Sequence, residues 1–252
     1  MLLNNRLPEY VIESVAKRIA GDIVWSSSPS IELRRWREIY GLSQVDIARI
    51  MKVSYSVVSD YERGKREPGR RFIRQFVKAL LEYDSSRGWV ITRKVAILLG
   101  FYVEGIIDMA EFLSPIRLEE ILKLTKGILI TPFIEHRPIK GYTIVDSIRT
   151  IESLAANEFV KLMGATSDRV MVFTRITRGR SPLVAIRVAP VKPSVVILHG
   201  IKKVDIIAIR IAIKEYIPLI VAPYISIEEI AKNFRNYTLS AKSLSTTYLS
   251  NK

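Results

Sequence analysis

The chain has 252 residues, of which 48% are hydrophobic and 25% are charged, so it has the composition of a globular protein rather than of a disordered one. It contains no cysteine, which excludes disulfides, thiolate zinc sites and thiol catalysis. The formal net charge of +14 favours a polyanionic partner such as nucleic acid, although a charge that serves solubility would look the same.

The positive charge is concentrated in two blocks. Residues 31–78 carry a net charge of +6 and residues 141–252 one of +8, whereas residues 1–30 and 79–140 are neutral. A chain of this length accommodates two domains, and the two blocks indicate where they lie.

Neither secretion nor a membrane span is expected. Residues 1–10 contain a proline and several polar residues in place of the apolar core of a signal peptide. The most apolar stretch, residues 195–224, is interrupted by charged residues and so falls short of the about 20 apolar residues that a spanning helix needs. The sequence therefore predicts a cytoplasmic protein without membrane contact.

Residues 1–30 predict an N-terminal helix and a linker. Apolar residues recur at helical spacing over residues 9–20, directly after Pro8. The serine-rich residues 25–30 then form a turn that offers a cap to the next helix.

Residues 31–64 follow the order helix, turn, helix, turn, helix. Gly41 ends the first helix, and Ser43 caps the second with Asp46 as a shortened capping box. Ser54 caps the third helix. These boundaries predict a compact three-helix motif.

This pattern resembles the Cro and cI repressor family, the XRE-type helix-turn-helix, over residues 31–84, with residues 70–83 as the following helix. The three parts of the family's sequence motif appear here as Gln44 to Ala48, Val53-Ser54 and Tyr61-Glu62-Arg63-Gly64. The N-terminal half also resembles archaeal XRE regulators with an added C-terminal domain. The resemblance implies an all-helical domain that binds double-stranded DNA and regulates transcription.

The resemblance also implies which residues contact DNA. In such folds the third helix lies in the major groove and the second crosses the backbone. Carried over by position, the residues at the base edges are Tyr55, Ser56, Ser59 and Asp60, with the capping Ser54 beside them. The residues expected at phosphates are Gln44, Arg63, Lys65 and Arg66. Tyr61 and Glu62 are assigned to folding.

Asp60 has two interpretations. A carboxylate can only accept hydrogen bonds, so it would take one from the N4 amine of cytosine or orient an adjacent arginine. Alternatively it pairs with a neighbouring cation such as Arg63 or Lys65.

Residues 85–140 predict a helical connector. Apolar residues recur every three or four positions over residues 92–112, namely Val95, Leu98, Leu99, Tyr102, Ile106, Met109 and Ala110. The predicted helix is neutral, which favours a homodimer interface between two basic chains, although it would serve equally to cover the protein's own core. Pro115 begins another helix that ends near Gly127, and residues 128–134 form a strand or buried connector.

Residues 141–236 predict a small mixed α/β domain, so the expected fold class is α plus α/β. Short β-branched runs at residues 170–174, 183–188, 195–198 and 219–222 are typical of strands, with helices at 204–216 and 227–234. The order over residues 195–234 is βαβα, which predicts a parallel strand pair. The first two runs predict an antiparallel hairpin, and residues 237–252 a loose tail.

A ligand site in this domain is a hypothesis. The basic turn with Arg178, Arg180 and Ser181 would hold a small anionic effector, touch DNA or simply be solvated. His199 ends a strand where ligands of open α/β sheets bind, although a lone histidine there is more often structural. No phosphate-binding glycine loop, metal-ligand spacing or cofactor motif occurs.

Two other functions compete with sequence-specific regulation. An architectural DNA-binding role would use the second basic block without a specific operator. An enzyme would have to use scattered groups, namely Asp146, Glu152, Arg178, Arg180, His199 and Asp205, but no nucleophile stands beside a base. The sequence therefore predicts no catalytic residues and a homodimeric regulator that senses a ligand or partner.

Overall fold

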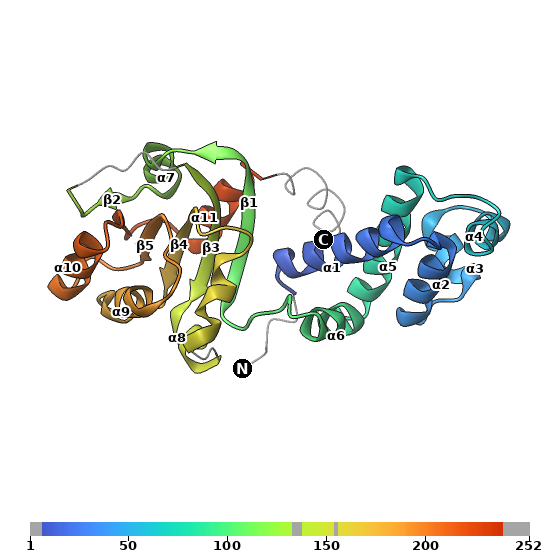
Figure 1. Cartoon of the computed structure of the whole chain (residues 1–252), viewed down its shortest axis with the longest axis horizontal. Helices are drawn as coiled ribbons and strands as arrows, with labels where there is room; N and C mark the ends of the chain where they lie inside the picture. The colour runs from blue at the N-terminus through green and yellow to red at the C-terminus, as the bar shows by residue number, and fades with distance from the viewer. Residues whose placement is uncertain (1–6, 133–137, 154–155, 239–252) are drawn as a thin grey trace. The chain divides into compact units, whose positions relative to one another are not determined.

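Helices come first in the chain and the sheet comes second (Figure 1). The structure is a computed structural model that describes residues 7–132, 138–153 and 156–238. The chain divides into an N-terminal unit, Met1–Tyr102, and a C-terminal unit, Val103–Lys252. The predicted fold class, helical first and mixed α/β second, is confirmed.

The described part of the N-terminal unit is entirely helical. Its helices are α1 (Glu9–Trp25), α2 (Pro29–Ile39), α3 (Gln44–Met51), α4 (Tyr55–Glu62), α5 (Arg70–Ser86) and α6 (Val90–Leu98). Helix α1 packs against α2, α5 and α6. The residues predicted as a separate N-terminal helix and linker therefore contribute to the same core as the helices that follow them.

The start of α6 is fixed by a buried carboxylate on α5. Asp84 is fully buried and accepts hydrogen bonds from the backbone N–H of Ile91, at 3.1 Å, and of Thr92, at 2.7 Å. These are N–H groups that the first turn of a helix leaves without intrahelical partners. Asp84 thus substitutes for a local cap and ties α5 to α6.

The predicted long helix over residues 92–112 is wrong. Helix α6 ends at Leu98, and β1 (Ile106–Ile116) begins in the other unit. Gly100 and Gly105 both have positive φ angles, +69° and +90°, which break a helix. The predicted connector 85–140 is therefore divided between the two units.

The C-terminal unit contains a six-stranded sheet in the described chain, in the order β1-β3-β4-β5-β6-β2. The other strands are β2 (Ile128–Leu129), β3 (Ile139–Asp146), β4 (Arg169–Thr174), β5 (Val195–His199) and β6 (Leu219–Ala222). Strands β3 to β6 are parallel, and the edge strands β1 and β2 are antiparallel to their neighbours.

Helices cover both faces of this sheet. They are α7 (Leu118–Thr125), α8 (Ser147–Ser153), the 3₁₀ helix η1 (Ala156–Met163), α9 (Arg180–Val188), α10 (Ile206–Lys214) and α11 (Ile227–Arg235). Right-handed crossovers in one direction place α9 and α10 on the same face. Helices α7 and α11 pack over the other face, as Figure 1 shows, around a core that includes Phe112, Tyr142 and Phe234.

The parallel arrangement over residues 195–234 is confirmed, because β5, α10, β6 and α11 follow one another and β5 pairs with β6 in parallel. The predicted antiparallel hairpin is wrong, since Leu183 to Val188 lie in α9. Helix α7 starts at Leu118 rather than Pro115, which belongs to β1. Residues 133 and 134 of the predicted strand lie outside the described residues.

A buried ion pair ties the end of the described chain to β1. Asp108 is buried, accepts a hydrogen bond from the Tyr142 hydroxyl at 2.7 Å and pairs with the guanidinium of Arg235 on α11. The main chain of Thr238 then forms a bridge with Phe112 of β1. Tyr237 and Thr238 are thus packed rather than part of a loose tail, and residues 239–252 lie outside the described residues.

Two glycines of the C-terminal unit provide a test of the packing where β1 begins. A Cβ on Gly105 would lie 2.7 Å from the backbone nitrogen of Thr150, whereas one on Gly200 would meet nothing within 4 Å. Both residues have a positive φ angle, which costs a non-glycine residue roughly 1–2 kcal/mol.

We therefore expect Gly200→Ala to lower the free energy of unfolding by that conformational cost alone. Gly105→Ala should lower it by about 1–3 kcal/mol more, because the backbone of α8 must move. Chemical denaturation of the two variants measures the difference, and equal losses would contradict the described approach of Gly105 to Thr150.

Candidate nucleic-acid interface

Helix α3 begins with the predicted capping box. The Ser43 hydroxyl accepts a hydrogen bond from the Asp46 N–H at 3.1 Å, and the Asp46 carboxylate accepts from the Ser43 N–H at 3.3 Å. The hydrogen bond from the Ser43 hydroxyl to this carboxylate is the main reason that the pKa of Asp46 lies below its usual 3.8. The local sequence therefore fixes where α3 starts.

Ser54 stands at the N-cap position of α4, as predicted, but its side chain does not cap the helix. Its hydroxyl instead forms a hydrogen bond with the hydroxyl of Ser56 at 2.8 Å. Both side chains are exposed in front of the first turn of α4. The pair presents donors and acceptors to the solvent at the end of the helix that was predicted to face the bases.

The other predicted base-contacting residues divide into exposed and buried. Tyr55 is 49% exposed, and Asp60 is half-buried. Ser59 is only 5% exposed, so the prediction that it faces the bases is wrong. Val58, Ser59 and Glu62 lie within one turn of each other on the inward face of α4, and their side chains are buried.

Asp60 lies near two cations of the loop after α4. Its carboxylate is 3.9 Å from the ammonium of Lys65 and 3.6 Å from the guanidinium of Arg66. Pairing with a neighbouring cation was one of the two interpretations of Asp60, and Lys65 was one of its named partners. Arg63 is exposed and is not the partner.

A buried ion pair joins the first and last helices of the motif. The guanidinium of Arg37 on α2 donates to both carboxylate oxygens of Glu62 on α4, at 2.6 and 2.8 Å. The side chains are 9% and 2% exposed. Arg37 also donates to the carbonyl of Leu42 at 2.7 Å, and its hydrogen bonds to Glu62 raise the pKa of Arg37.

Gln44 is the third member of this network. Its side-chain amide donates to Glu62 at 2.7 Å, which uses one of its two N–H groups. The predicted phosphate anchor is therefore held in place by the carboxylate at the end of α4. We call Arg37, Gln44 and Glu62 the Arg37–Glu62 network.

Tyr61 and Glu62 were assigned to folding, and the contacts of Glu62 described above agree with this. The ring of Tyr61 stacks on that of Phe72 of α5, with 3.7 Å between the ring centroids. Arg37 was not identified as the partner of Glu62. The two residues are 25 positions apart, and an arginine on a charged helix carries no sign of burial in the sequence.

The predicted ligand residues of the C-terminal unit lie at the carboxyl ends of β4 and β5. Arg178 and Ser181 are exposed, and neither side chain has a partner among the described residues. Arg180 is paired with Asp205 at 3.0 Å. His199 forms a hydrogen bond through Nε2 with the carbonyl of Ile225 at 2.7 Å, as a structural histidine does.

The acidic groups near this edge have structural partners. Asp205 caps α10 by accepting from the Ile207 N–H at 2.8 Å. Asp146 accepts from the Ile148 N–H and pairs with Arg175, both at about 3.0 Å.

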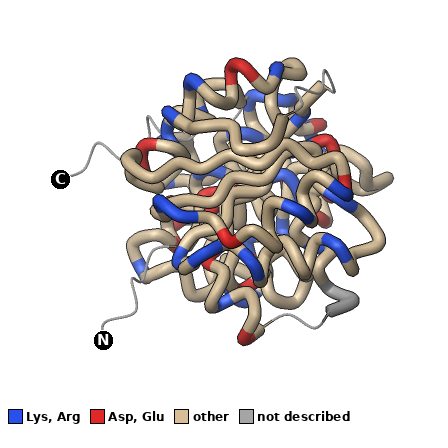
Figure 2. The backbone as a smooth tube through the Cα atoms, turned by 90° about the vertical axis from the view of Figure 1, so that its left-hand side faces the viewer, with Lys and Arg blue, Asp and Glu red and all other residues tan. Residues whose placement is uncertain are grey.

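On the side shown in Figure 2, Lys and Arg are spread over several elements with Asp and Glu between them.

The described residues provide neither a metal site nor a membrane-spanning helix. They contain no group of three or more His, Asp or Glu residues placed to hold a metal ion. Among them, no helix combines the length and hydropathy of a membrane span. His136 lies outside the described residues.

Comparisons with known proteins point to DNA. A family model described as helix-turn-helix matches residues 33–80. A protein of Archaeoglobus fulgidus, named as an HTH-type transcriptional regulator, is 44% identical over 224 residues, which cover 88% of this chain and 96% of that one. A protein of Methanocaldococcus jannaschii with the same description is 37% identical and covers 83% of this chain and 89% of its own.

One solved structure is weakly similar. It contains the CBS and DRTGG domains of the regulatory region of Clostridium perfringens pyrophosphatase, complexed with diadenosine tetraphosphate. The TM-score is 0.35 and the identity 16%, over 47% of each chain. A likeness of this size implies nothing about a ligand of the present chain.

The Arg37–Glu62 network can be tested against an exposed ion pair on α2. Glu62→Ala removes both hydrogen bonds that the buried Arg37 guanidinium donates to a carboxylate and leaves only the exposed Glu38, 3.6 Å away, as a countercharge, so it should lower the free energy of unfolding by about 3–5 kcal/mol. Arg34→Ala removes the exposed cation that pairs with Glu38 and leaves Arg37 unchanged, so it should change the free energy of unfolding little.

Urea denaturation measures both changes. Glu62→Gln keeps a hydrogen-bond acceptor but loses the charge, so its effect on the free energy of unfolding should lie between the other two. Equal losses for Glu62→Ala and Arg34→Ala would show that the buried pair does not support the fold.

Proposed function

Since the chain belongs to the family of archaeal HTH-type transcriptional regulators, we propose that it binds a specific operator through α4 and that its C-terminal unit senses a small anionic effector. The observation that carries the first part is the division of α4 into two faces. Its inward face, with Ser59 and Glu62, is buried, whereas Tyr55 and Ser56 remain exposed at its N-terminal end.

The exposed end of α4 suits the major groove. In helix-turn-helix proteins the N-terminal residues of the recognition helix reach base edges. The hydroxyls of Ser56 and Tyr55 can donate or accept, so each can read a base. Asp60, held near Lys65 and Arg66, would orient these cations rather than read cytosine.

The backbone of the DNA would be held beside these residues. The second amide hydrogen of Gln44 is available for a phosphate oxygen, while Glu62 fixes the side chain. Arg63, Lys65 and Arg66 are exposed in the loop that follows α4. Such contacts set the position of the helix and carry no sequence information.

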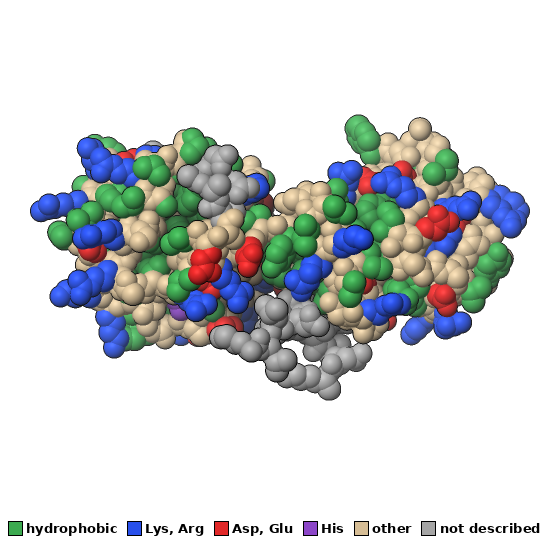
Figure 3. All heavy atoms as spheres, turned by 90° about the horizontal axis from the view of Figure 1, so that it is seen from below, with side chains coloured by type: hydrophobic (Ala, Val, Ile, Leu, Met, Phe, Trp, Pro, Cys, Tyr) green, Lys and Arg blue, Asp and Glu red, His purple; other side chains and the backbone are tan. Residues whose placement is uncertain are grey.

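We propose that the active form is a dimer on a two-fold operator, because one recognition helix reads only a few base pairs. The predicted interface helix does not exist, but α6 still exposes apolar side chains at Val90, Ile97 and Leu98, which are 57–76% exposed. Figure 3 shows that hydrophobic side chains reach the surface of both units. This part of α6 replaces residues 92–112 as the surface that we expect to meet a second copy.

The C-terminal unit is proposed to be a sensor without catalytic activity. The groups that an enzyme would use are engaged, since Asp146 and Asp205 cap helices and His199 bonds a carbonyl. Arg178 and Ser181 remain available where the chain passes from the end of β4 into α9, and they present a guanidinium and a hydroxyl to an anion.

Variants of α4 separate regulation from an architectural role. Tyr55→Ala and Ser56→Ala should relax base preference, with each lost contact costing about 1–3 kcal/mol of discrimination. Arg63→Ala should weaken binding to every sequence evenly, because it would contact only phosphates. Selection from random duplexes, followed by affinity measurements and a footprint, gives all three results.

A two-fold footprint with half-sites about one helical turn apart supports the dimer. Unchanged base preference in both the Tyr55 and Ser56 variants would refute the placement of α4. Equal affinity of the wild type for all sequences would favour the architectural role.

An effector at the carboxyl edge should stabilise the protein in proportion to its occupancy. We expect pyrophosphate or ATP to raise the Tm of the wild type by more than that of an Arg178→Ala, Ser181→Ala variant. Arg187→Ala is the control, because Arg187 is an exposed arginine further along α9 that lies 3.9 Å from Glu215. An equal rise in the wild type and in the double variant would place the effector elsewhere.

A further inference from the structure

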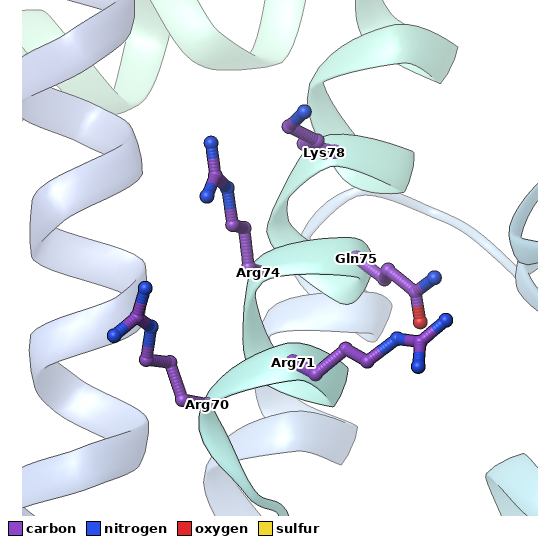
Figure 4. Close-up of a pocket in the computed structure, with 5 residues that line it drawn as sticks. All are labelled: Arg70, Arg71, Arg74, Gln75 and Lys78. Carbon is purple, nitrogen blue, oxygen red and sulfur yellow. The ribbon is translucent and has the colours of Figure 1, made fainter. Parts of the chain in front are cut away.

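A second positively charged surface lies on the first half of α5. A pocket of about 400 Å³ is lined by Arg70, Arg71, Arg74, Gln75 and Lys78. In Figure 4, Arg70 and Arg74 point to one side of α5, and Arg71 and Gln75 point to the other. We call these five residues the α5 basic face.

The arginines of this face have no countercharge in the described chain. The side chains of Arg70, Arg71 and Arg74 form no ion pair or hydrogen bond with the described residues. By contrast, the arginines of α2 and Arg49 of α3 each lie beside a carboxylate. The positive charge of these three arginines of α5 is therefore not neutralised within the described part of the chain.

This arrangement is unfavourable for the fold alone. Arg70 and Arg74 are like charges one turn apart, which destabilises a helix. Arg70 and Arg71 also lie in the first turn, which carries no acidic residue, at the positive end of the helix dipole. An anion bound at this face would relieve both repulsions.

Solubility does not require a face of one sign. A solvated helix surface is served as well by mixed charges, yet residues 70–78 contain four cations and no carboxylate. The carboxylates of α5, Glu82 and Asp84, come only in its later turns. The opposite face of the helix is buried in the core, through residues such as Phe72, Phe76 and Leu80.

The α5 basic face continues the cations that follow the recognition helix. Arg63, Lys65 and Arg66 are exposed in the loop between α4 and α5. Arg70 and Arg74 come next in the chain and lie about 6 Å apart along the axis of α5, at 1.5 Å per residue. Phosphates of one DNA strand are spaced about 3.4 Å along the duplex axis, so two arginines one turn apart match a short run of them.

We propose that the α5 basic face binds the phosphate backbone of duplex DNA next to the stretch that α4 reads. The inference rests on the proposed function in that α4 must place the protein on DNA. Guanidinium groups bind phosphate oxygens in a bidentate way, and such contacts do not depend on base sequence. The face thus lengthens the footprint and strengthens binding without adding base readout.

The experiment compares the salt dependence of binding for four proteins: the wild type, Arg74→Gln, Arg74→Lys and Lys123→Gln. Lys123 is an exposed cation of α7, so its variant removes the same charge from the C-terminal unit, away from α5 and from the proposed dimer surface on α6. Each protein is titrated with a long duplex and with one trimmed to the base pairs that α4 protects.

On the long duplex, Arg74→Gln should lower the slope of log K against log salt concentration by about 1, since one phosphate contact is lost. Arg74→Lys, which keeps the charge, and Lys123→Gln should keep the wild-type slope. On the trimmed duplex all four slopes should agree. Circular dichroism of each variant confirms that it is folded.

Equal slopes for Arg74→Gln and Lys123→Gln on the long duplex would overturn the proposal, as would a lower slope of Arg74→Gln that persists on the trimmed duplex. Failure of the proposed function is a separate result. If the wild type shows no base preference, the slopes are measured on any long duplex and still decide whether Arg74 contacts phosphates.

Discussion

The ion pair between Arg37 and Glu62 fixes the part of the molecule that meets DNA. A buried carboxylate without a partner is strongly destabilising, so Glu62 constrains α4 to the one position in which Arg37 can reach both of its oxygens. Gln44 joins the same carboxylate from the first residue of α3. This buried ion pair therefore fixes how α4 is placed against α2. The exposure of Tyr55 and Ser56 follows from that placement.

Elements that depend on neighbouring residues could be predicted from the sequence. The capping box of Ser43 and Asp46 needs only a four-residue stretch, and the parallel β5-α10-β6 order needs only alternation of helix and strand signals. The helix-turn-helix belongs to this class, because each of its boundaries has a marker such as Gly41. The inward position of Ser59 does not, since serine is compatible with either face of a helix.

Elements that depend on distant partners could not be predicted. The stretch from Thr92 to Phe112 has apolar spacing that fits a helix, but β1 is held by β3 and by the contact of Asp108 with Arg235, 127 residues away. The run Leu183 to Val188 is β-branched, yet Gly179 allows α9 to start close against Leu198, where a Cβ would lie 2.4 Å from a methyl group. Tertiary packing decides both cases against local propensity.

The edge strand β1 affects whether the sheet can aggregate with a second molecule. An unpaired strand edge is a template for pairing with another chain. Here the pairing of β1 with β3 shifts register twice, between Ile106 and Asp108 and between Glu111 and Ile116, and Pro115 removes a backbone donor. Thr238 bridges Phe112 on β1. These irregularities leave little straight backbone for a second molecule to extend, so the sheet is protected from aggregation at this edge without a covering helix.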